Sequence, residues 1–323
     1  MFWLAALFVA LIACVAIRNG VKWYEHPIPG LLVDPGGLVS NLGLPDWSNK
    51  RLGLKYPDRV APTDFSETVS GGRARVTAWD RSVLEAQSTG YLDAIITVDR
   101  TQRSVRLPIT PLQPLAWWLY GGSFIIAGIL YAGAGLVALW ASPNGKLARA
   151  FARFAVSAGV FQLTLFDAHT ERTLTPVFFA TYAVFPTSLV FLLLHLPSTV
   201  TWLRPRPWLE TSAVGAAGAL GLTAAAMHEL GRDIAPLQVF FNLLAGAGFA
   251  VFATGFLFRY LRSRGEQQQT LRALLLSMIP PYAITSFIMV LAPASLELMV
   301  AVTPESTLKL AAPIMVSVPE LTE

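Results

Sequence analysis

The amino-acid sequence predicts a polytopic α-helical membrane bundle of about seven or eight spans, with a small β-rich domain after the first span. Three observations lead to this prediction: the composition is apolar, long apolar stretches recur along the chain, and the loops between them alternate in charge. The 323 residues are 54% hydrophobic and only 14% charged, with a mean hydropathy of +0.53. An ordinary soluble protein of this length is more polar.

The apolar stretches after residue 115 define a six-helix bundle over residues 116–292. We place its spans at 116–140, 152–167, 175–196, 209–228, 236–258 and 271–292. Prolines lie near most of these boundaries, where a residue without a backbone N–H is best tolerated. The last segment, 293–323, is long enough for a further span, but it carries Glu305 and Lys309 in its middle. Each central charge costs about 2.5–3.5 kcal/mol, so the sequence leaves open whether this segment crosses the membrane.

The loops of the bundle are alternately basic and acidic. Those near 141–153, 197–208 and 259–272 together hold nine basic residues: Lys146, Arg149, Arg153, Arg204, Arg206, Arg259, Arg262, Arg264 and Arg272. The intervening loops hold Arg172 and Arg232, outnumbered by Asp167, Glu171, Glu229 and Asp233. By the positive-inside rule the basic loops are cytoplasmic.

The chain begins with a transmembrane anchor, residues 1–18, whose amino terminus we place in the cytoplasm. Cys14 is the only cysteine, so the chain has no intrachain disulfide and no cysteine-based metal site. The preceding Leu-Ile-Ala resembles a lipoprotein cleavage box, but no Lys or Arg lies before it as a signal peptide requires. The sequence leaves lipidation of Cys14 open.

Residues 19–115 form a separate extracytoplasmic domain, because this stretch is charged, rich in Pro and Gly, and lacks a long apolar helix. Strand-like patterns occur at 31–33, 37–39, 75–79, 91–98 and 103–109, with a turn at 99–102 and a short helix at 82–87. Prolines 108, 111 and 114 predict an extended linker into the bundle.

Three motifs in this domain resemble a degenerate PDZ-type domain: 29–39 (PGLLVDPGGLV), 44–47 (LPDW) and 53–60 (GLKYPDRV). Such domains follow the first span in multi-spanning bacterial sensor proteins, notably quorum-sensing-type sensor histidine kinases. In that family a Gly-Asp-Arg-Ile-like turn leads into the domain core, and here Pro57 stands where Gly is usual. The next family turn, Val-Asp-Gly-like, is poorly matched by 62–65 (PTDF).

The resemblance covers roughly residues 1–292 and implies a sensor in the bacterial inner membrane. The kinase half of that family has no counterpart in the sequence, which contains neither a phosphoacceptor His in a helical pair nor ATP-binding boxes. A truncated sensor and a sensor that acts through a cytoplasmic kinase or another signalling partner both fit, and a homodimer is left open.

Other activities lack the residues they need. His228-Glu229 could begin a zinc-protease motif, but Arg232 occupies the place of the second His. No Gly-x-Ser-x-Gly elbow lies in a span, and no basic and aromatic stripe suits a nucleic acid. We therefore predict no enzyme activity, no cofactor, no metal and no nucleic-acid partner.

Candidate site residues lie at the outer ends of two spans: Asp167, His169 and Glu171, and His228, Glu229 and Asp233. Grouped polar residues over a bundle can bind a small ligand, although a solvated cluster at the helix ends is the competing interpretation. Two further groups complete the predicted set: helix-packing amides, Gln162 and Asn242, and hinge prolines, Pro186, Pro280 and Pro281.

The function predicted from these features is signal reception, with an extracytoplasmic ligand or peptide acting on a bundle in the lipid bilayer. A transporter or channel is one alternative, against which stands the scarcity of charge inside the spans. A membrane scaffold that binds peptides through the outer domain is another.

Overall fold

The computed structural model describes residues 2–35, 37–63, 72–98, 101–196, 203, 206–265, 268–269 and 271–272. Outside these residues lie the segment 293–323, the hinge prolines Pro280 and Pro281, and all but the first two residues of the predicted span 271–292. Of the turn predicted at 99–102, residues 99–100 also lie outside them, and residues 101–102 belong to a strand.

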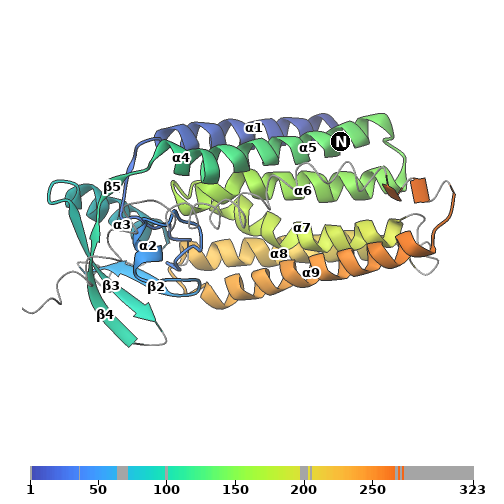
Figure 1. Cartoon of the computed structure of the whole chain (residues 1–323). Coiled ribbons are helices and arrows are strands. Elements are labelled where there is room, and N and C mark those ends of the chain that lie inside the picture. The colour runs from blue at the N-terminus through green and yellow to red at the C-terminus, as the bar shows by residue number, and fades with distance from the viewer. Residues whose placement is uncertain are drawn as a thin grey trace, which may run out of the picture.

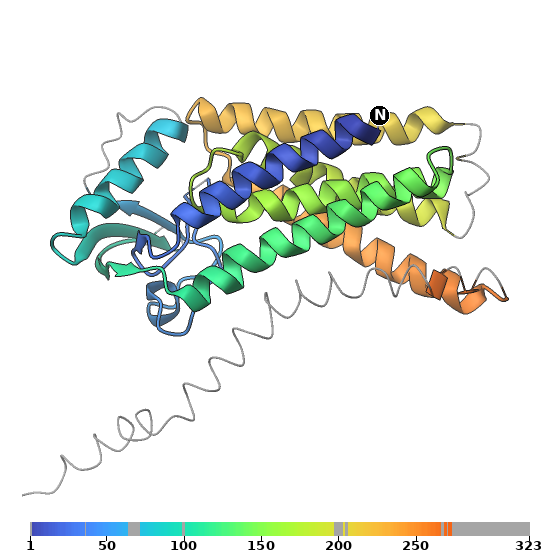
Figure 2. The same ribbon diagram turned by 90° about the horizontal axis from the view of Figure 1, so that it is seen from above.

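Long helices lie side by side and form the larger part of the described chain (Figure 1). They are α1 (Phe2–Lys22), α5 (Ser123–Ala141), α6 (Lys146–His169), α7 (Thr175–His195), α8 (Pro207–Glu229) and α9 (Ala235–Arg262), with the short α4 (Pro114–Trp117) and the π-helical turn η1 (Trp118–Gly122) leading into α5. Seen from above (Figure 2), α1 and α5 cover one face of the bundle and α9 crosses beneath them. The first five predicted spans of the bundle are confirmed as helices to within six residues at either end.

Within the described part of the chain, four helical segments are long and apolar enough to cross a membrane: Phe2–Lys22, Pro114–Ala141, Thr175–His195 and Ala235–Arg262. Proline occupies the first turn of α4, α7, α8 and α9, where its missing N–H removes no helical hydrogen bond. The protein is thus mostly helical, with several helices suited to a bilayer.

Small residues allow α5 and α6 to pack closely. A Cβ atom added to Gly128 would lie 2.8 Å from the carbonyl oxygen of Gly159 and 2.9 Å from the backbone nitrogen of Leu163. One added to Gly133, also on α5, would meet no atom within 4 Å. Gly128 therefore lies in the contact between α5 and α6, whereas Gly133 of the same helix faces open space.

The β-rich domain, residues 23–113, is built on an antiparallel sheet in the order β2 (Arg59–Pro62), β3 (Tyr91–Val98), β4 (Thr101–Pro108). A second, two-stranded sheet pairs β1 (Pro27–Ile28) with β5 (Thr110–Pro111) and so closes the domain beside the bundle. Alternate residues of β3 are buried, namely Leu92, Ala94 and Ile96, and they pack with Val39, Leu54 and Leu107 in the domain core.

Two extended segments, 31–34 and 37–40, precede the main sheet. They are joined by the antiparallel bridge between Val33 and Val39, and Leu38 bridges to Arg59 at the start of β2. The turn between them needs Gly37, whose φ of +78° lies in the left-handed region. The predicted strands at 31–33 and 37–39 are therefore found as single bridges next to the sheet.

The strand predicted at 75–79 is wrong, because these residues belong to one helix, α3 (Gly72–Ala86). The short helix predicted at 82–87 is confirmed over residues 82–86 as the end of that longer helix. Trp79, Val83 and Ala86 pack on the domain core, and their spacing of four and three residues is helical. In contrast, β3 matches its predicted boundaries, and β4 lies within two residues of its own.

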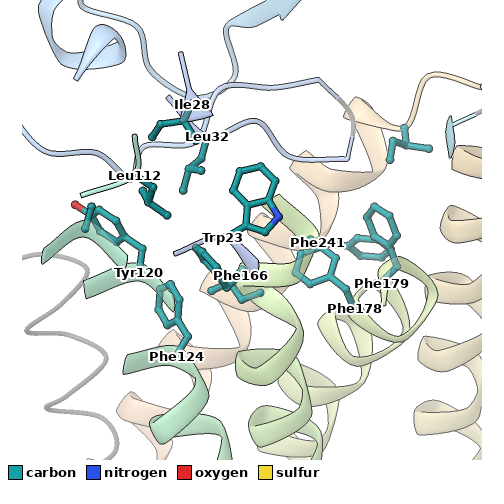
Figure 3. Packing of buried hydrophobic residues seen from close by; sticks show 14 of the residues in the cluster. Trp23, Ile28, Leu32, Leu112, Tyr120, Phe124, Phe166, Phe178, Phe179 and Phe241 are labelled. Carbon is teal, nitrogen blue, oxygen red and sulfur yellow. The ribbon is translucent and has the colours of Figure 1, made fainter. Parts of the chain in front are cut away.

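The β-rich domain sits on one end of the bundle, and the α5–α6 connection, the end of α7, the start of α8 and the end of α9 lie at the opposite end (Figure 1). One buried cluster joins domain and bundle: Trp23, Leu32 and Trp47 pack with aromatic residues of the helices, among them Tyr120, Phe166, Phe178 and Phe241. Figure 3 shows Trp23 close to Leu32 of the domain and Phe166 of the bundle.

We predict that Gly128→Ala lowers the free energy of unfolding by about 1–3 kcal/mol, because the added methyl group overpacks the α5–α6 contact. Gly133→Ala should be neutral or raise stability by up to about 1 kcal/mol, since alanine favours the helix. Thermal or denaturant unfolding of the detergent-solubilised chain measures both. Equal effects of the two substitutions would contradict the packing.

Candidate functional site

The end of the bundle beneath the β-rich domain, called the rim below, consists of the loop at 170–174, the loop at 230–234 and the adjoining helix ends. All six predicted site residues lie on this rim. Among the described residues, they do not form a cluster of three or more groups suited to a metal ion. They fall into two sets, one near α1 and one near the α8–α9 loop.

Asp167 organises the first set. Its side chain is 2% exposed and accepts hydrogen bonds from Asn19 Nδ2 at 2.6 Å, from Thr173 Oγ1 at 3.0 Å and from the backbone N–H of Leu174 at 2.7 Å. A buried carboxylate needs such donors to offset the loss of water. Asp167 therefore ties the end of α1 to the connection between α6 and α7.

The neighbouring polar residues of this set also bind α1 or their own helix. Glu171 accepts hydrogen bonds from Lys22 Nζ and Trp23 Nε1, both at 3.2 Å. His169 Nδ1 lies 2.8 Å from the carbonyl oxygen of Leu165, within α6. The acidic groups of this loop are thus engaged by protein partners.

In the second set, Asp233 joins bundle and domain. Both of its carboxylate oxygens accept hydrogen bonds from Arg59 Nη2, at 3.0 and 2.8 Å, and Oδ1 also accepts the backbone N–H of Ala235. His228 is buried and Glu229 is half-buried at the end of α8. The sequence reasoning placed Asp233 in the candidate site but did not foresee its contact with the domain.

Two further contacts attach the domain to the rim. Gln238 Nε2, in the first turn of α9, donates to Asp34 Oδ2 at 2.9 Å, and Asp34 Oδ1 accepts the backbone N–H of Leu38. Arg172 Nη2 donates to the carbonyl oxygen of Val33 at 3.1 Å. These residues were missed because their partners are remote in sequence: 204 positions separate Asp34 from Gln238.

Arg172 is held in an unfavourable backbone conformation, with φ at +57°. A non-glycine residue there costs about 1–2 kcal/mol. Its backbone N–H donates to the carbonyl oxygen of Asp167 at 2.7 Å, which fixes the loop in this shape. Burial lowers the pKa of the guanidinium, and the charges of Asp80, Asp34 and Asp167 oppose that shift.

A small cavity of about 10 Å³ lies between the domain and the rim, room for about one water molecule. Its walls come from the 23–33 segment, α3 and the end of α6, and include Trp23, His26, Leu32, Trp79, Asp80 and His169. Burial raises the pKa of Asp80 to about 6. The positive charge of Arg172 acts against this rise, and the negative charge of Glu171 adds to it. Burial also lowers the pKa of His26, opposed by Glu171.

A second polar cluster, which the sequence reasoning missed, lies at the opposite end of the bundle. Glu210 on α8 accepts from Arg153 of α6 at 3.0 Å and is 3.1 Å from Nε2 of His195 on α7. His195 and Glu210 have side chains 7% and 9% exposed. The signal in the sequence is a lone acidic residue near a basic loop, which indicates an ion pair between helices.

The remaining predicted residues, two amides and one proline, lie within helices of the bundle. Gln162 is buried within α6, and Asn242 on α9 accepts a hydrogen bond from the Tyr182 hydroxyl of α7. Pro186 lies inside α7, where a Cβ atom added to Gly248 of α9 would come within 3.0 Å of its ring. The hinge role of Pro186 stays a prediction.

Comparison of the chain with protein-family models, with curated proteins and with solved structures finds no match.

We predict that Asp80→Asn raises the free energy of unfolding by about 1–2 kcal/mol at pH 8 and changes it little at pH 4. With a pKa raised from 3.8 to about 6, the folded state binds this proton more tightly than the unfolded chain. Ionised Asp80 therefore destabilises the fold above pH 6, and the penalty fades as the pH falls toward 3.8. Denaturant unfolding at both pH values measures the difference.

Asp93→Asn provides the control, because Asp93 is exposed in its ion pair with Arg106. Its effect should stay within about 0.5 kcal/mol at both pH values. An Asp80→Asn effect that is the same at pH 4 and pH 8 would contradict the burial of this carboxylate.

Proposed function

We propose that the chain is a bacterial inner-membrane signal-reception module, in which the extracytoplasmic β-rich domain passes a stimulus to the helices through the rim. One observation supports it most: domain and bundle share one buried core, which includes Trp23, Leu32 and Trp47. A domain packed in this way cannot move without disturbing the helices, because packed cores have discrete arrangements. A cytoplasmic signalling partner would receive the output.

We further propose that the membrane-crossing helices number seven or eight. The packing of α6 among α1, α5 and α7 supports this, since a helix enclosed by membrane helices crosses with them. On α8, a Cβ atom added to Gly221 would overlap the carbonyl oxygen of Phe179, so α8 packs tightly on α7. The extended segments at 31–34 and 37–40, with α3 and the antiparallel sheet, support a PDZ-like domain.

The orientation gives a direct prediction. In a Cys14→Ser background, a cysteine at Ser142 should resist an impermeant thiol reagent in whole cells, and a cysteine at Ser88 should react. Both positions are exposed, Ser142 after α5 and Ser88 in the β-rich domain. Labelling is read by gel shift with intact cells and with lysed cells. The reverse pattern would contradict the proposed topology.

Signalling should depend on the contact between Arg59 and Asp233. Asp233→Arg replaces an attraction by a repulsion and should shift the docking equilibrium about 5-fold, equivalent to about 1 kcal/mol. The double variant Arg59→Asp with Asp233→Arg reverses both charges and should restore the docking equilibrium and the response. RNA sequencing of host cells that express each variant measures the response.

The exposed pair of Asp93 and Arg106, which lies within the domain, provides the matched control, since its reversal leaves the rim intact. The proposal predicts a response changed by Asp233→Arg, restored by the double variant and unaffected in the control. Substrate flux through the purified chain in proteoliposomes would instead establish a transporter.

A further inference from the structure

The end of the bundle opposite the β-rich domain, called the far end below, comprises the starts of α6 and α8 and the ends of α5, α7 and α9, with the residues next to them. Its charges are strongly unbalanced. The exposed basic residues of this end include Lys146, Arg149, Arg206, Arg262 and Arg264. Within the described part of the chain, Glu210 is the one acidic residue there. The far end therefore presents an excess of positive charge.

The ion pair between Arg153 and Glu210 shows how the starts of α6 and α8 lie relative to each other. Arg153 Nη2 is 3.0 Å from Glu210 Oε1, and Arg153 Nε donates to the carbonyl oxygen of Arg149 at 3.3 Å. Both helices run from the far end toward the β-rich domain (Figure 1). Arg149 and Arg206 each precede a member of this pair by four residues, so each lies about 6 Å farther from the domain. The two arginines thus reach the same level at the surface of the far end.

Arg149 and Arg206 have no carboxylate of their own. The carboxylate nearest to them is already shared, because Glu210 accepts from Arg153 and lies 3.1 Å from Nε2 of His195. Both arginine side chains are exposed, and neither forms an ion pair with another described residue. Three guanidinium groups therefore lie near one carboxylate, which leaves two positive charges to be balanced from outside.

Tryptophan side chains place these arginines at the level of lipid headgroups. Trp208, two residues after Arg206, and Trp140, near the end of α5, are both exposed. Exposed tryptophans that flank apolar helices collect at the interface between the acyl chains and the headgroups of a bilayer. The groups that Arg149 and Arg206 meet at this depth are the phosphates of phospholipids.

Charge decides which phospholipid fits. Guanidinium groups bind phosphate oxygens through paired hydrogen bonds. A zwitterionic headgroup carries an ammonium group beside its phosphate, and this cation would meet two arginines that are themselves uncompensated. An anionic phospholipid brings no such cation, so it supplies the charge that the far end lacks.

We propose that Arg149 and Arg206 bind the phosphate of an anionic phospholipid, which bridges the starts of α6 and α8. The acyl chains of this lipid run beside the helices toward the middle of the bilayer. Its phosphate adds a tie between α6 and α8 next to the one that Glu210 provides. The inference goes beyond the proposed function and does not depend on it, since a transporter with this structure would bind the lipid equally.

The test uses the full chain in nanodiscs that hold phosphatidylglycerol and phosphatidylcholine in equal amounts, with identical acyl chains. Native mass spectrometry counts the lipids that stay bound when the disc dissociates, and the measured quantity is the ratio of bound phosphatidylglycerol to bound phosphatidylcholine. The wild type should retain an excess of phosphatidylglycerol. Arg149→Gln combined with Arg206→Gln should lower the ratio at least about 10-fold, because each basic residue beside an anionic headgroup contributes about 5-fold to binding.

Arg262→Gln combined with Arg264→Gln is the matched control. It removes two exposed charges from the same end of the bundle, beside the end of α9, where the guanidinium of Arg262 lies 4.0 Å from the centre of the Phe258 ring. The control should keep the wild-type ratio. An equal fall in the control would indicate attraction to a basic surface in general and would overturn the site, as would equal retention of the two lipids by the wild type.

A soluble anion is the competing source of phosphate. Excess glycerol phosphate should leave the ratio as it is in ammonium acetate of the same ionic strength, and a loss specific to glycerol phosphate would overturn the assignment to a lipid. Should the double variant fail to fold, Arg149→Gln and Arg206→Gln are tested singly, and each should lower the ratio about 5-fold. An unchanged ratio in both single variants overturns the proposal.

Discussion

The buried carboxylate of Asp167 is the interaction on which the arrangement of the rim depends. It accepts hydrogen bonds from Asn19 at the end of α1 and from Thr173 and Leu174 at the start of α7. Three donors make a nearly dry carboxylate tolerable, and removal of any one leaves a buried charge less satisfied. The three helices α1, α6 and α7 are therefore fixed relative to one another at the end that meets the β-rich domain.

The position of Arg172 follows from that constraint. The carbonyl of Asp167 accepts its backbone N–H, and the side chain of Asp167 holds Leu174 only two residues further on. A loop pinned at both ends leaves Arg172 in the left-handed region, with its side chain directed at Val33. The strain at this residue is thus offset by the hydrogen bonds of its neighbours, which is how strained residues persist near functional contacts.

The sequence predicts those features that depend on local pattern. Five helices of the bundle and the strand β3 follow from hydropathy and periodicity. Part of the helix α3 reads as a strand in the sequence, because polar and apolar residues alternate over Arg75–Ala78, whereas the helical spacing of its core residues spans a longer window. Local alternation over four residues is too short to decide between the two periods.

The candidate site could be predicted only in part, for a different physical reason. The polar residues of the rim stand out because charge is scarce in this chain, and all six predicted site residues, four acidic residues and two histidines, do lie at one end of the bundle. Their partners could not be predicted, since Asn19 lies 148 positions from Asp167 and Arg59 lies 174 positions from Asp233. Arg172 counted in the sequence only as one charge in an acidic loop, and its role depends on a backbone carbonyl that composition cannot reveal.

The two ends of the bundle are held by different chemistry, and this difference suggests where movement can occur. At the end far from the domain, the carboxylate of Glu210 joins α6, α7 and α8 through Arg153 and His195, and both Glu210 and His195 are nearly inaccessible to water. Breaking such a buried ionic contact is costly. The rim contacts of Arg59 and Lys22 are partly exposed, so solvent compensates their loss. Under the function that we propose, a stimulus at the domain opens the rim first, while the Glu210 cluster keeps the far ends of these helices together. Because Pro186 interrupts the hydrogen bonding of α7 between the rim and the Glu210 cluster, bending of α7 is the motion that this arrangement opposes least.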